Sequence, residues 1–233
     1  SNKRILDNLQ NDLGMKSSPK HIECFDNSNI QGEYAVGACV VFKNAKPSKK
    51  DYRHFNIKTV EGPNDYASMQ EIVFRRYNRL LKERKELPQL IIIDGGKGQL
   101  SSALISLEKL NLTDKIAVIG IAKRLEEIYF PNDSTPLYLD KRSESLKLIQ
   151  QLRDEAHRFG ITHHRNKRLK AKFSSSLEEI KGIGSKTKDV LLSHYKTNSK
   201  VFAADIKELE KLIGKSRAEK IKRVFYKKTK NNI

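Results

Sequence analysis

The feature that most constrains the fold is a short run at residues 90–93, which is apolar throughout and ends at Asp94. Apolar residues at every position, rather than at every second one, are typical of a strand that is buried on both faces. Residues 117–122 form a second run of this kind. Such strands need a covering layer on each side, which helices usually provide. The chain is therefore predicted to contain an α/β domain.

The remaining segments of that domain predict a mixed sheet with helices. Three runs rich in β-branched and aromatic residues come first and predict an antiparallel meander, at residues 21–26, 35–43 and 52–57. Helices are predicted at residues 65–81, 99–110 and 143–172, from the spacing of their apolar residues or from their length. A β-hairpin is expected at residues 127–139. Asp65 is the expected N-cap of the first of these helices.

Composition divides the chain into three parts. Residues 1–19 are polar, end in Ser17-Ser18-Pro19, and are predicted to form an N-terminal helix and linker. Residues 20–173 hold the predicted α/β domain. Ser174-Ser175-Ser176 is expected to break the chain, and residues 174–233 carry only helical patterns, so they predict a small all-α domain.

The last part contains a degenerate repeat. Ile183-Gly184 and Ile213-Gly214 lie thirty residues apart. Apolar residues recur at equal intervals after each glycine, namely Leu191 and Ile221, then Tyr195 and Phe225. The shared spacing favours a duplication over a chance match, and predicts two helical hairpins that share one small core.

Charge indicates the class of partner. Lys and Arg total 46 against 28 Asp and Glu, which gives a formal net charge of +18. The alternative is a basic protein without a polyanionic ligand. It is disfavoured, because repulsion among so many positive charges would then destabilise the protein without serving a function. Residues 165–172 contain basic residues and no acid. A solvated helix face usually mixes signs, so this one-signed run favours a track for nucleic-acid phosphates.

Several classes of protein are disfavoured. The only two cysteines, Cys24 and Cys39, lie in apolar strand-like runs and form neither a disulfide framework nor a zinc-ligand spacing. They are interpreted as reduced core residues of a cytoplasmic protein. No apolar run approaches the roughly 20 residues of a membrane span, and no signal peptide is visible. Because the first residue is serine, the chain is expected to be part of a longer protein.

Two acids lie at or near the ends of predicted strands. Asp26 follows the first apolar run, and Asp94 ends the fourth strand. If the strands are neighbours, about 4.8 Å apart, the two carboxylates would repel unless a divalent cation lay between them. Oxygen ligands suit Mg²⁺ or Mn²⁺. Taken singly, each acid favours an ordinary role, a turn or cap residue for Asp26 and a helix N-cap for Asp94; taken together on one sheet, they strengthen the metal interpretation but do not decide it.

Other polar residues have two interpretations each. His157 lies beside the apolar stripe of the long helix and would be a metal ligand or a proton-transfer group, but the residues alone favour a packing histidine. Residues 95–98 lack the spacing of a nucleotide-binding P-loop. This glycine-rich turn would still let backbone N–H groups and Lys97 approach a DNA phosphate. His163 and His164 are interpreted as surface residues near phosphate.

The hairpins are expected to bind the DNA backbone rather than the bases. Two glycines at residues 181–186 allow a tight turn before a new helix, whose first N–H groups can bind a phosphate oxygen. The second hairpin keeps one glycine, so its grip on phosphate is expected to be weaker or purely structural. The candidate DNA-binding residues are Lys97, Arg158, Arg165, Lys181, Gly182, Gly184, Lys186, Gly214 and Lys215.

These motifs together resemble the C-terminal half of UvrC, the nuclease subunit of bacterial nucleotide-excision repair. The stretches that carry the resemblance include IECFDNS at residues 22–28, YRHFNI at 52–57, DYASM at 65–69, DGGKGQ at 94–99 and DEAHRF at 154–159. The last two, in this order, are highly specific. The hairpin tail is less specific, because many DNA-repair proteins carry one.

The resemblance implies an RNase H-like endonuclease with a metal site of Asp26, Asp94 and His157, followed by a tandem helix-hairpin-helix domain. It implies that Mg²⁺ or Mn²⁺ serves incision on the 5′ side of a lesion, that UvrB is a partner, and that the DNA carries single-strand/double-strand junctions. Asp65 matches another aspartate of the family and is taken as a further catalytic candidate beside these three. Many relatives carry histidine where this chain has Asn29, so no metal role is assigned to Asn29.

Two other functions remain open on the sequence alone. One is a non-catalytic, structure-specific DNA-binding module of a repair complex, which the presence of all three candidate ligands disfavours. The other is a transposase or resolvase on the same fold, which the repair-type hairpin tail disfavours. The family's N-terminal nuclease domain and its UvrB-contacting segment lie outside this sequence, so dual incision is not expected of it.

Overall fold

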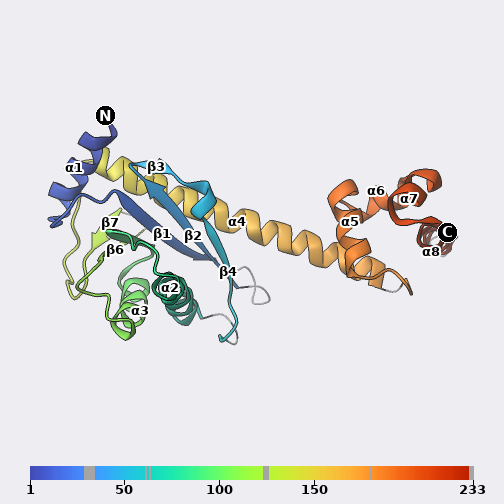
Figure 1. The fold of residues 1–233 in the computed structure, drawn as a ribbon, viewed down its shortest axis with the longest axis horizontal. Coiled ribbons are helices and arrows are strands. Elements are labelled where there is room, and N and C mark those ends of the chain that lie inside the picture. Colours follow the sequence, from blue (N-terminus) through green and yellow to red (C-terminus); the bar gives the residue numbers. More distant parts are fainter. Residues whose placement is uncertain (29–34, 61, 63, 123–125, 179, 231–233) are drawn as a thin grey trace. The chain divides into compact units, whose positions relative to one another are not determined.

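The computed structural model describes residues 1–28, 35–60, 62, 64–122, 126–178 and 180–230. The chain forms two compact units, Ser1–His164 and Arg165–Ile233, each with its own core. The predicted connection around Gln31-Gly32, and Asn29, lie outside the described residues. The first unit holds the sheet and the second is helical (Figure 1).

A seven-stranded mixed sheet forms the centre of the first unit. Its strands are β1 (His21–Ser28), β2 (Val36–Lys43), β3 (Lys46–Pro47), β4 (Arg53–Asn56), β5 (Leu90–Asp94), β6 (Ala117–Ala122) and β7 (Glu127–Tyr129). The order is β3-β2-β1-β5-β6-β7, with β4 paired to β2. Strand β2 is antiparallel to β1 and β4, as the predicted meander requires. Strands β1, β5 and β6 are parallel, so the predicted mixed α/β sheet is confirmed.

Helices cover the two faces of this sheet (Figure 1). The helices that contribute to the core of the first unit are α1 (Asn2–Asp12), α2 (Asp65–Lys82), α3 (Lys97–Lys109) and the first part of α4 (Glu144–Glu178). Alternation along β1 sends Glu23 and Phe25 to the face covered by α2, where Phe25 meets Tyr77. Asp26 points to the opposite face and meets His157 of α4.

Two local predictions are wrong. Asn64, not Asp65, is the N-cap of α2, and its side chain accepts a hydrogen bond from the backbone N–H of Ala67. Asn and Asp cap helices equally well, so adjacent candidates cannot be ranked by residue type. Helix α4 also continues through Ser174-Ser175-Ser176 to Glu178. Serine has only moderately low helix propensity, and Phe173 and Leu177, one turn apart, anchor this stretch in a core.

The second unit is a small helical core built on the predicted repeat. After the end of α4 come α5 (Ser185–Tyr195), α6 (Asn198–Ala203), α7 (Ile206–Ile213) and α8 (Lys215–Lys230). The two glycines of the repeat, Gly184 and Gly214, each directly precede a helix. Its apolar positions share one core, which includes Ile183, Leu191, Ile213 and Ile221. The side chain of Phe225 lies outside the described residues.

Positive φ angles explain why glycine is needed at two hairpin positions. Gly182 has φ +96 and Gly214 has φ +85, a region that residues with a Cβ rarely adopt. The tight turns expected from the glycine pattern are therefore present in both hairpins.

Two observations bear on the class of protein. Among the described residues, no helix is long and apolar enough to cross a membrane. Cys24 and Cys39 are both free and buried, as predicted. Burial raises the pKa of both thiols well above the ordinary value, so they remain protonated core residues.

Candidate metal centre

The sheet places Asp26 and Asp94 side by side. In the parallel pairing of β1 with β5, Phe25 lies opposite Ile93, so the next residue on each strand is one of the two acids. Because residues at equal register share a face, both carboxylates point to the face that α4 covers. Asp26 is 4% exposed and Asp94 is 5% exposed. The sheet therefore buries two like charges next to each other.

Helix α4 brings an imidazole to the same place. Nδ1 of His157 lies 3.0 Å from Oδ2 of Asp26, and its side chain is 44% exposed. The neighbouring residues Leu152 and Ala156 are fully buried in the core, which fixes this face of the helix against the sheet. One ligand atom each from Asp26, Asp94 and His157 lies within 4.8 Å of the others. Three side chains far apart in sequence thus converge.

The donor set of this group fits a divalent cation. Two buried carboxylates repel each other, and a cation between them removes that cost. Carboxylate oxygens are the ligands of Mg²⁺ and Mn²⁺, and an imidazole nitrogen is common at Mn²⁺ and other transition metals. Both acids also affect a neighbouring thiol. Burial is the main cause that raises the pKa of Cys24, and the charges of Asp94 and Asp26 raise it further. The arrangement could hold a metal through Asp26, Asp94 and His157.

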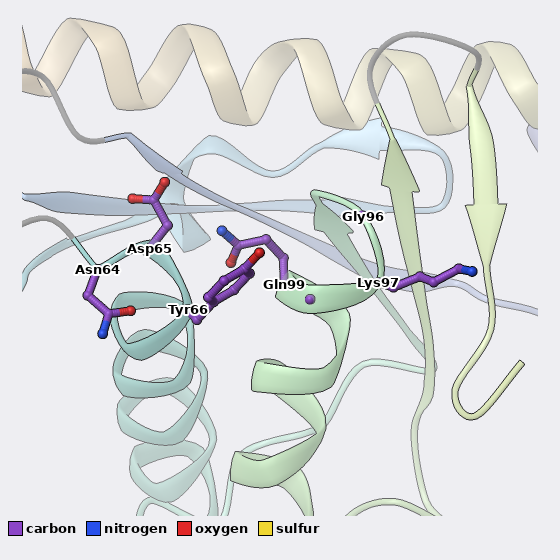
Figure 2. Close-up of a pocket in the computed structure, with 7 residues that line it drawn as sticks. Asn64, Asp65, Tyr66, Gly96, Lys97 and Gln99 are labelled. Atoms are coloured by element: carbon purple, nitrogen blue, oxygen red, sulfur yellow. The ribbon is translucent and has the colours of Figure 1, made fainter. Parts of the chain in front are cut away.

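Asp65 lies beside this group but is not part of it. It is exposed, in the first turn of α2, and its backbone carbonyl accepts a hydrogen bond of 2.5 Å from Nδ2 of Asn27. Asn27 directly follows Asp26, so this bond ties the start of α2 to the metal-binding group. Asp65 lines a surface pocket between the first turns of α2 and α3, which Figure 2 shows.

Sequence reasoning missed the residues that clamp α4 onto the sheet. The ring of His54, on β4, stacks on Phe159 with centroids 3.6 Å apart, and its Nε2 lies 3.1 Å from the Phe159 carbonyl oxygen. The hydroxyl of Tyr52 donates to Oε1 of Glu155. Phe159 and Glu155 flank His157 in the helix. The YRHFNI stretch indicated a strand, but no sequence pattern reveals which helix it meets.

A second buried acid, Glu23, lies on the opposite face of β1. Nη2 of Arg76 forms an ion pair with Oε1 of Glu23 and donates a hydrogen bond of 2.6 Å to it. The hydroxyl of Tyr77 donates a hydrogen bond of 2.8 Å to Oε2 of Glu23. Nε2 of His21 lies 3.1 Å from Oε1. Burial alone would raise the pKa of Glu23, but the hydrogen bonds and charges of His21 and Arg76 lower it to about 2. A charged residue within the apolar IECF run was the one signal of this cluster.

The candidate DNA-binding residues of the first unit are already engaged. The ammonium of Lys97 lies 5.1 Å from the ring centroid of Tyr129, which is a cation–π distance. The guanidinium of Arg158 donates to both carboxylate oxygens of Glu155, at 2.7 and 2.8 Å. To bind phosphate, Lys97 would have to leave its ring, and Arg158 would act beside a carboxylate.

The hairpin candidates of the second unit are open to solvent. Lys181, Gly182, Gly184 and Lys186 line one surface pocket, which Arg217 of α8 completes. A Cβ on Gly182 would come within 2.9 Å of Nζ of Lys220, so α8 supplies another cation to the first hairpin. Arg165 and Lys215 are exposed, and Gly214 directly precedes α8. The sequence did not reveal that the second hairpin contributes cations to the first.

Comparison with known families matches the two units separately. Residues 10–161 match the UvrC RNAse H endonuclease domain. Residues 174–225 match the SAM-like helix-hairpin-helix tandem. The first match ends just before the division between the units, and the second lies within the helical unit.

Two curated relatives show the extent of the similarity. UvrABC system protein C of Flavobacterium psychrophilum is 64% identical over 228 residues, which cover 98% of this chain and 38% of that protein. The protein of the same name from Bacteroides thetaiotaomicron is 48% identical over 94% of this chain and 37% of its own length. The chain therefore spans well under half of the curated relatives it matches.

One solved structure shows a weaker likeness. Ciona intestinalis Endonuclease V, in complex with a 24mer DNA containing an inosine followed by a ribo-adenosine, has a TM-score of 0.36 and 23% sequence identity. The alignment covers 64% of this chain and 65% of that chain. A likeness this weak supports no conclusion about fold or function.

Proposed function

The chain belongs to the UvrC family, with an RNase H-like endonuclease domain and a helix-hairpin-helix region, and from that premise we propose that its first unit makes the 5′ incision beside a DNA lesion in nucleotide-excision repair. The observation that carries the proposal is the convergence of Asp26, Asp94 and His157 within 4.8 Å. The site would hold Mg²⁺ or Mn²⁺, because its two carboxylates supply the oxygen ligands that either ion takes.

Each of the three side chains has a defined task in this proposal. A bound divalent cation supplies Lewis-acid chemistry, lowering the pKa of a water and stabilising negative charge on the leaving oxygen. Asp26 and Asp94 bind the cation from adjacent strands, whose backbone pairing fixes their separation. His157 is held in place by its contact from Nδ1 to Asp26 and acts as a third ligand or moves a proton. Asp65, whose backbone carbonyl is bound by Asn27 next to Asp26, would help to position DNA or water.

We propose that the second unit binds the DNA backbone and directs where the first unit cuts. The exposed cations and glycines of both hairpins would contact phosphates, with Arg165 adding to the track. The DNA would be damaged duplex with a single-strand/double-strand junction, in a cytoplasmic complex that includes UvrB. The match of residues 174–225 to a helix-hairpin-helix family supports the DNA-binding part of this proposal.

Nicking of a lesion-bearing junction duplex, with UvrB present and Mg²⁺ or Mn²⁺ supplied, tests the nuclease. Asp26→Ala and Asp94→Ala are expected to abolish nicking and Mn²⁺ binding by calorimetry, while DNA affinity stays largely intact. Asp133→Ala is a matched control, because Asp133 is an exposed turn residue whose carboxylate accepts a local hydrogen bond from the backbone N–H of Thr135. Binding without nicking by the unaltered chain would favour a non-catalytic module instead.

The salt dependence of DNA affinity tests the second unit. Affinity is expected to fall steeply with salt because phosphate contacts release counterions. Lys186→Ala should weaken binding uniformly across sequences and reduce the slope of log affinity against log salt by about 1. An affinity that does not change with salt would contradict the proposed phosphate track.

A further inference from the structure

A surface pocket lies next to the metal-binding group, and residues close in sequence to Asp26 and Asp94 line it or contact its lining. It is lined by Asn64, Asp65, Tyr66, Gly96, Lys97, Gly98 and Gln99 (Figure 2). Gly96 lies two residues after Asp94. On the other side, Asn27 follows Asp26 and donates a hydrogen bond to the Asp65 carbonyl. A DNA strand with a phosphate at the metal-binding group would therefore have a neighbouring nucleotide within reach of this pocket.

An exposed aromatic ring and an amide form one side of the pocket. Tyr66 is 58% exposed although its ring is large and apolar. The ring lies directly against Gly98, where a Cβ would come within 2.5 Å of the ring carbon Cε1. Figure 2 shows the amide of Gln99 beside this ring. Oε1 of Gln99 is buried and has no hydrogen-bond partner among the described residues.

The charges in the pocket disfavour a phosphate and favour a base. Asp65 contributes a carboxylate, which would repel a phosphate. The ammonium of Lys97, the one cation of the lining, lies over the ring of Tyr129 and points away from Tyr66 and Gln99 (Figure 2). What remains is an aromatic face with amide groups beside it. This combination suits a nucleobase, because every base has a π-face for stacking and polar atoms on its edge.

We propose that this pocket binds one unstacked base of the DNA strand, next to the phosphate that is cut. The base stacks on Tyr66, and Gln99 hydrogen-bonds its edge. A base inside an intact duplex has no free face, so the pocket selects DNA that is single-stranded or distorted at that nucleotide. The inference rests on the proposed nuclease function for the position of the cut, but base binding itself can be measured without cleavage.

Fluorescence of 2-aminopurine tests the stacking directly. A junction duplex carries this base at successive positions near the cut, with Ca²⁺ in place of Mn²⁺ so that binding is read without nicking. The unaltered chain and Tyr66→Phe are expected to quench the probe at one position. Tyr66→Leu should lose that quenching and, with Mn²⁺ and UvrB, cut roughly tenfold more slowly, which is the size of one lost base–aromatic stack. Tyr138→Leu is the matched control, because Tyr138 is equally exposed and lies outside the pocket lining.

Gly98→Ala provides a second variant that leaves Tyr66 in the chain. Gly98 lies in the first turn of α3, where alanine favours the helix, so the fold should be retained. The added Cβ would displace the ring of Tyr66. We expect partial loss of quenching and of cutting rate, with the thermal unfolding midpoint unchanged or raised.

The outcomes separate this inference from the proposed function. Quenching that depends on Tyr66, in a chain that never cuts, supports the base pocket and removes the nuclease. Cutting by the unaltered chain and by Tyr66→Leu at equal rates, with quenching independent of residue 66, overturns the base pocket and leaves the nuclease standing.

Discussion

Strand β1 carries a buried acid on each face, and the two acids have different neighbours. On the face toward α2, Glu23 is fully buried and receives contacts from Arg76, Tyr77 and His21. On the face toward α4, Asp26 is almost as buried, but its neighbour across the sheet is another acid, Asp94. His157, which is half-exposed, contacts Asp26 on this face.

This difference shows how to tell a structural acid from a functional one. A buried carboxylate needs a compensating charge or several hydrogen bonds to offset its desolvation. The protein supplies these to Glu23 from its own side chains, so that acid stabilises the fold. Asp26 and Asp94 instead lie beside each other, so each raises the electrostatic cost of burying the other, and a bound cation would offset that repulsion. Function is therefore expected where two buried acids converge, rather than where a single acid is matched by a cationic side chain.

The largest expected effect comes from removing the structural acid. Glu23→Leu leaves the buried guanidinium of Arg76 without its carboxylate, and should lower the free energy of unfolding by about 3–5 kcal/mol. Urea unfolding followed by circular dichroism measures the loss. Glu23→Leu combined with Arg76→Leu should recover much of it, because no unpaired charge remains. A loss below 1 kcal/mol in the single variant would mean that the two faces do not differ as described.

Acid should remove part of the same stabilisation. The pKa of Glu23 is lowered to about 2 in the folded chain from an ordinary value of 4.5. A lowered folded pKa stabilises the protein above the unfolded pKa, and this contribution disappears as the pH falls toward about 2. Unfolding free energies measured from pH 6 downward should therefore fall more steeply for the unaltered chain than for the double Glu23/Arg76 variant. Parallel curves would contradict the assignment.

A smaller effect is expected from one hydroxyl of the Glu23 cluster. Tyr77→Phe removes the hydrogen bond from the phenol to Oε2 of Glu23 and keeps the ring that packs on Phe25. A hydrogen bond to a charged group contributes about 1.5–3 kcal/mol, so the unfolding free energy should fall by about 2 kcal/mol. Tyr129→Phe is a control of the same chemistry, because Tyr129 donates to Glu127 near the surface. Its expected loss is much smaller.

Periodicity predicted the elements of the fold better than their contacts. Apolar runs and helical spacing predicted the strands of the sheet and the helices that cover it, because these patterns are local. The same patterns placed Asp26 and Asp94 at or near strand ends. A shared cation could then be suggested on the assumption that the two strands are neighbours. Local signals were less exact at boundaries: Asn64 rather than Asp65 caps α2, and serines do not end α4.

The partners of the buried groups could not be predicted from the sequence. The pairing of Glu23 with Arg76 and the stack of His54 on Phe159 join elements far apart in the chain. Each depends on how helices settle on the sheet, which no local pattern specifies. The sequence around His157 favoured a packing role for this side chain. Its contact with Asp26 depends on how α4 packs against the sheet, which the sequence does not specify.

The smallest expected effect has the opposite sign and concerns Asp94, on the face of the sheet that α4 covers. Asp94→Asn removes one of two adjacent buried charges and keeps the shape of the side chain. In the presence of a chelator, it should therefore raise the free energy of unfolding, by on the order of 1 kcal/mol. Asp133→Asn, on an exposed turn, should change it little. Removing an acid thus lowers the free energy of unfolding on one face of the sheet and raises it on the other.

Adding metal should reverse the order of the two proteins. Mn²⁺ binds only the folded state of the unaltered chain, and at about 100 times its dissociation constant would stabilise that state by about 2.7 kcal/mol. Asp94→Asn, which lacks a charged ligand, should gain little. The variant would then be the more stable protein in chelator and the less stable one in Mn²⁺, as read by thermal unfolding. If Asp94→Asn destabilises the chain without metal, the second acid is compensated within the protein, and the contrast between the faces does not hold.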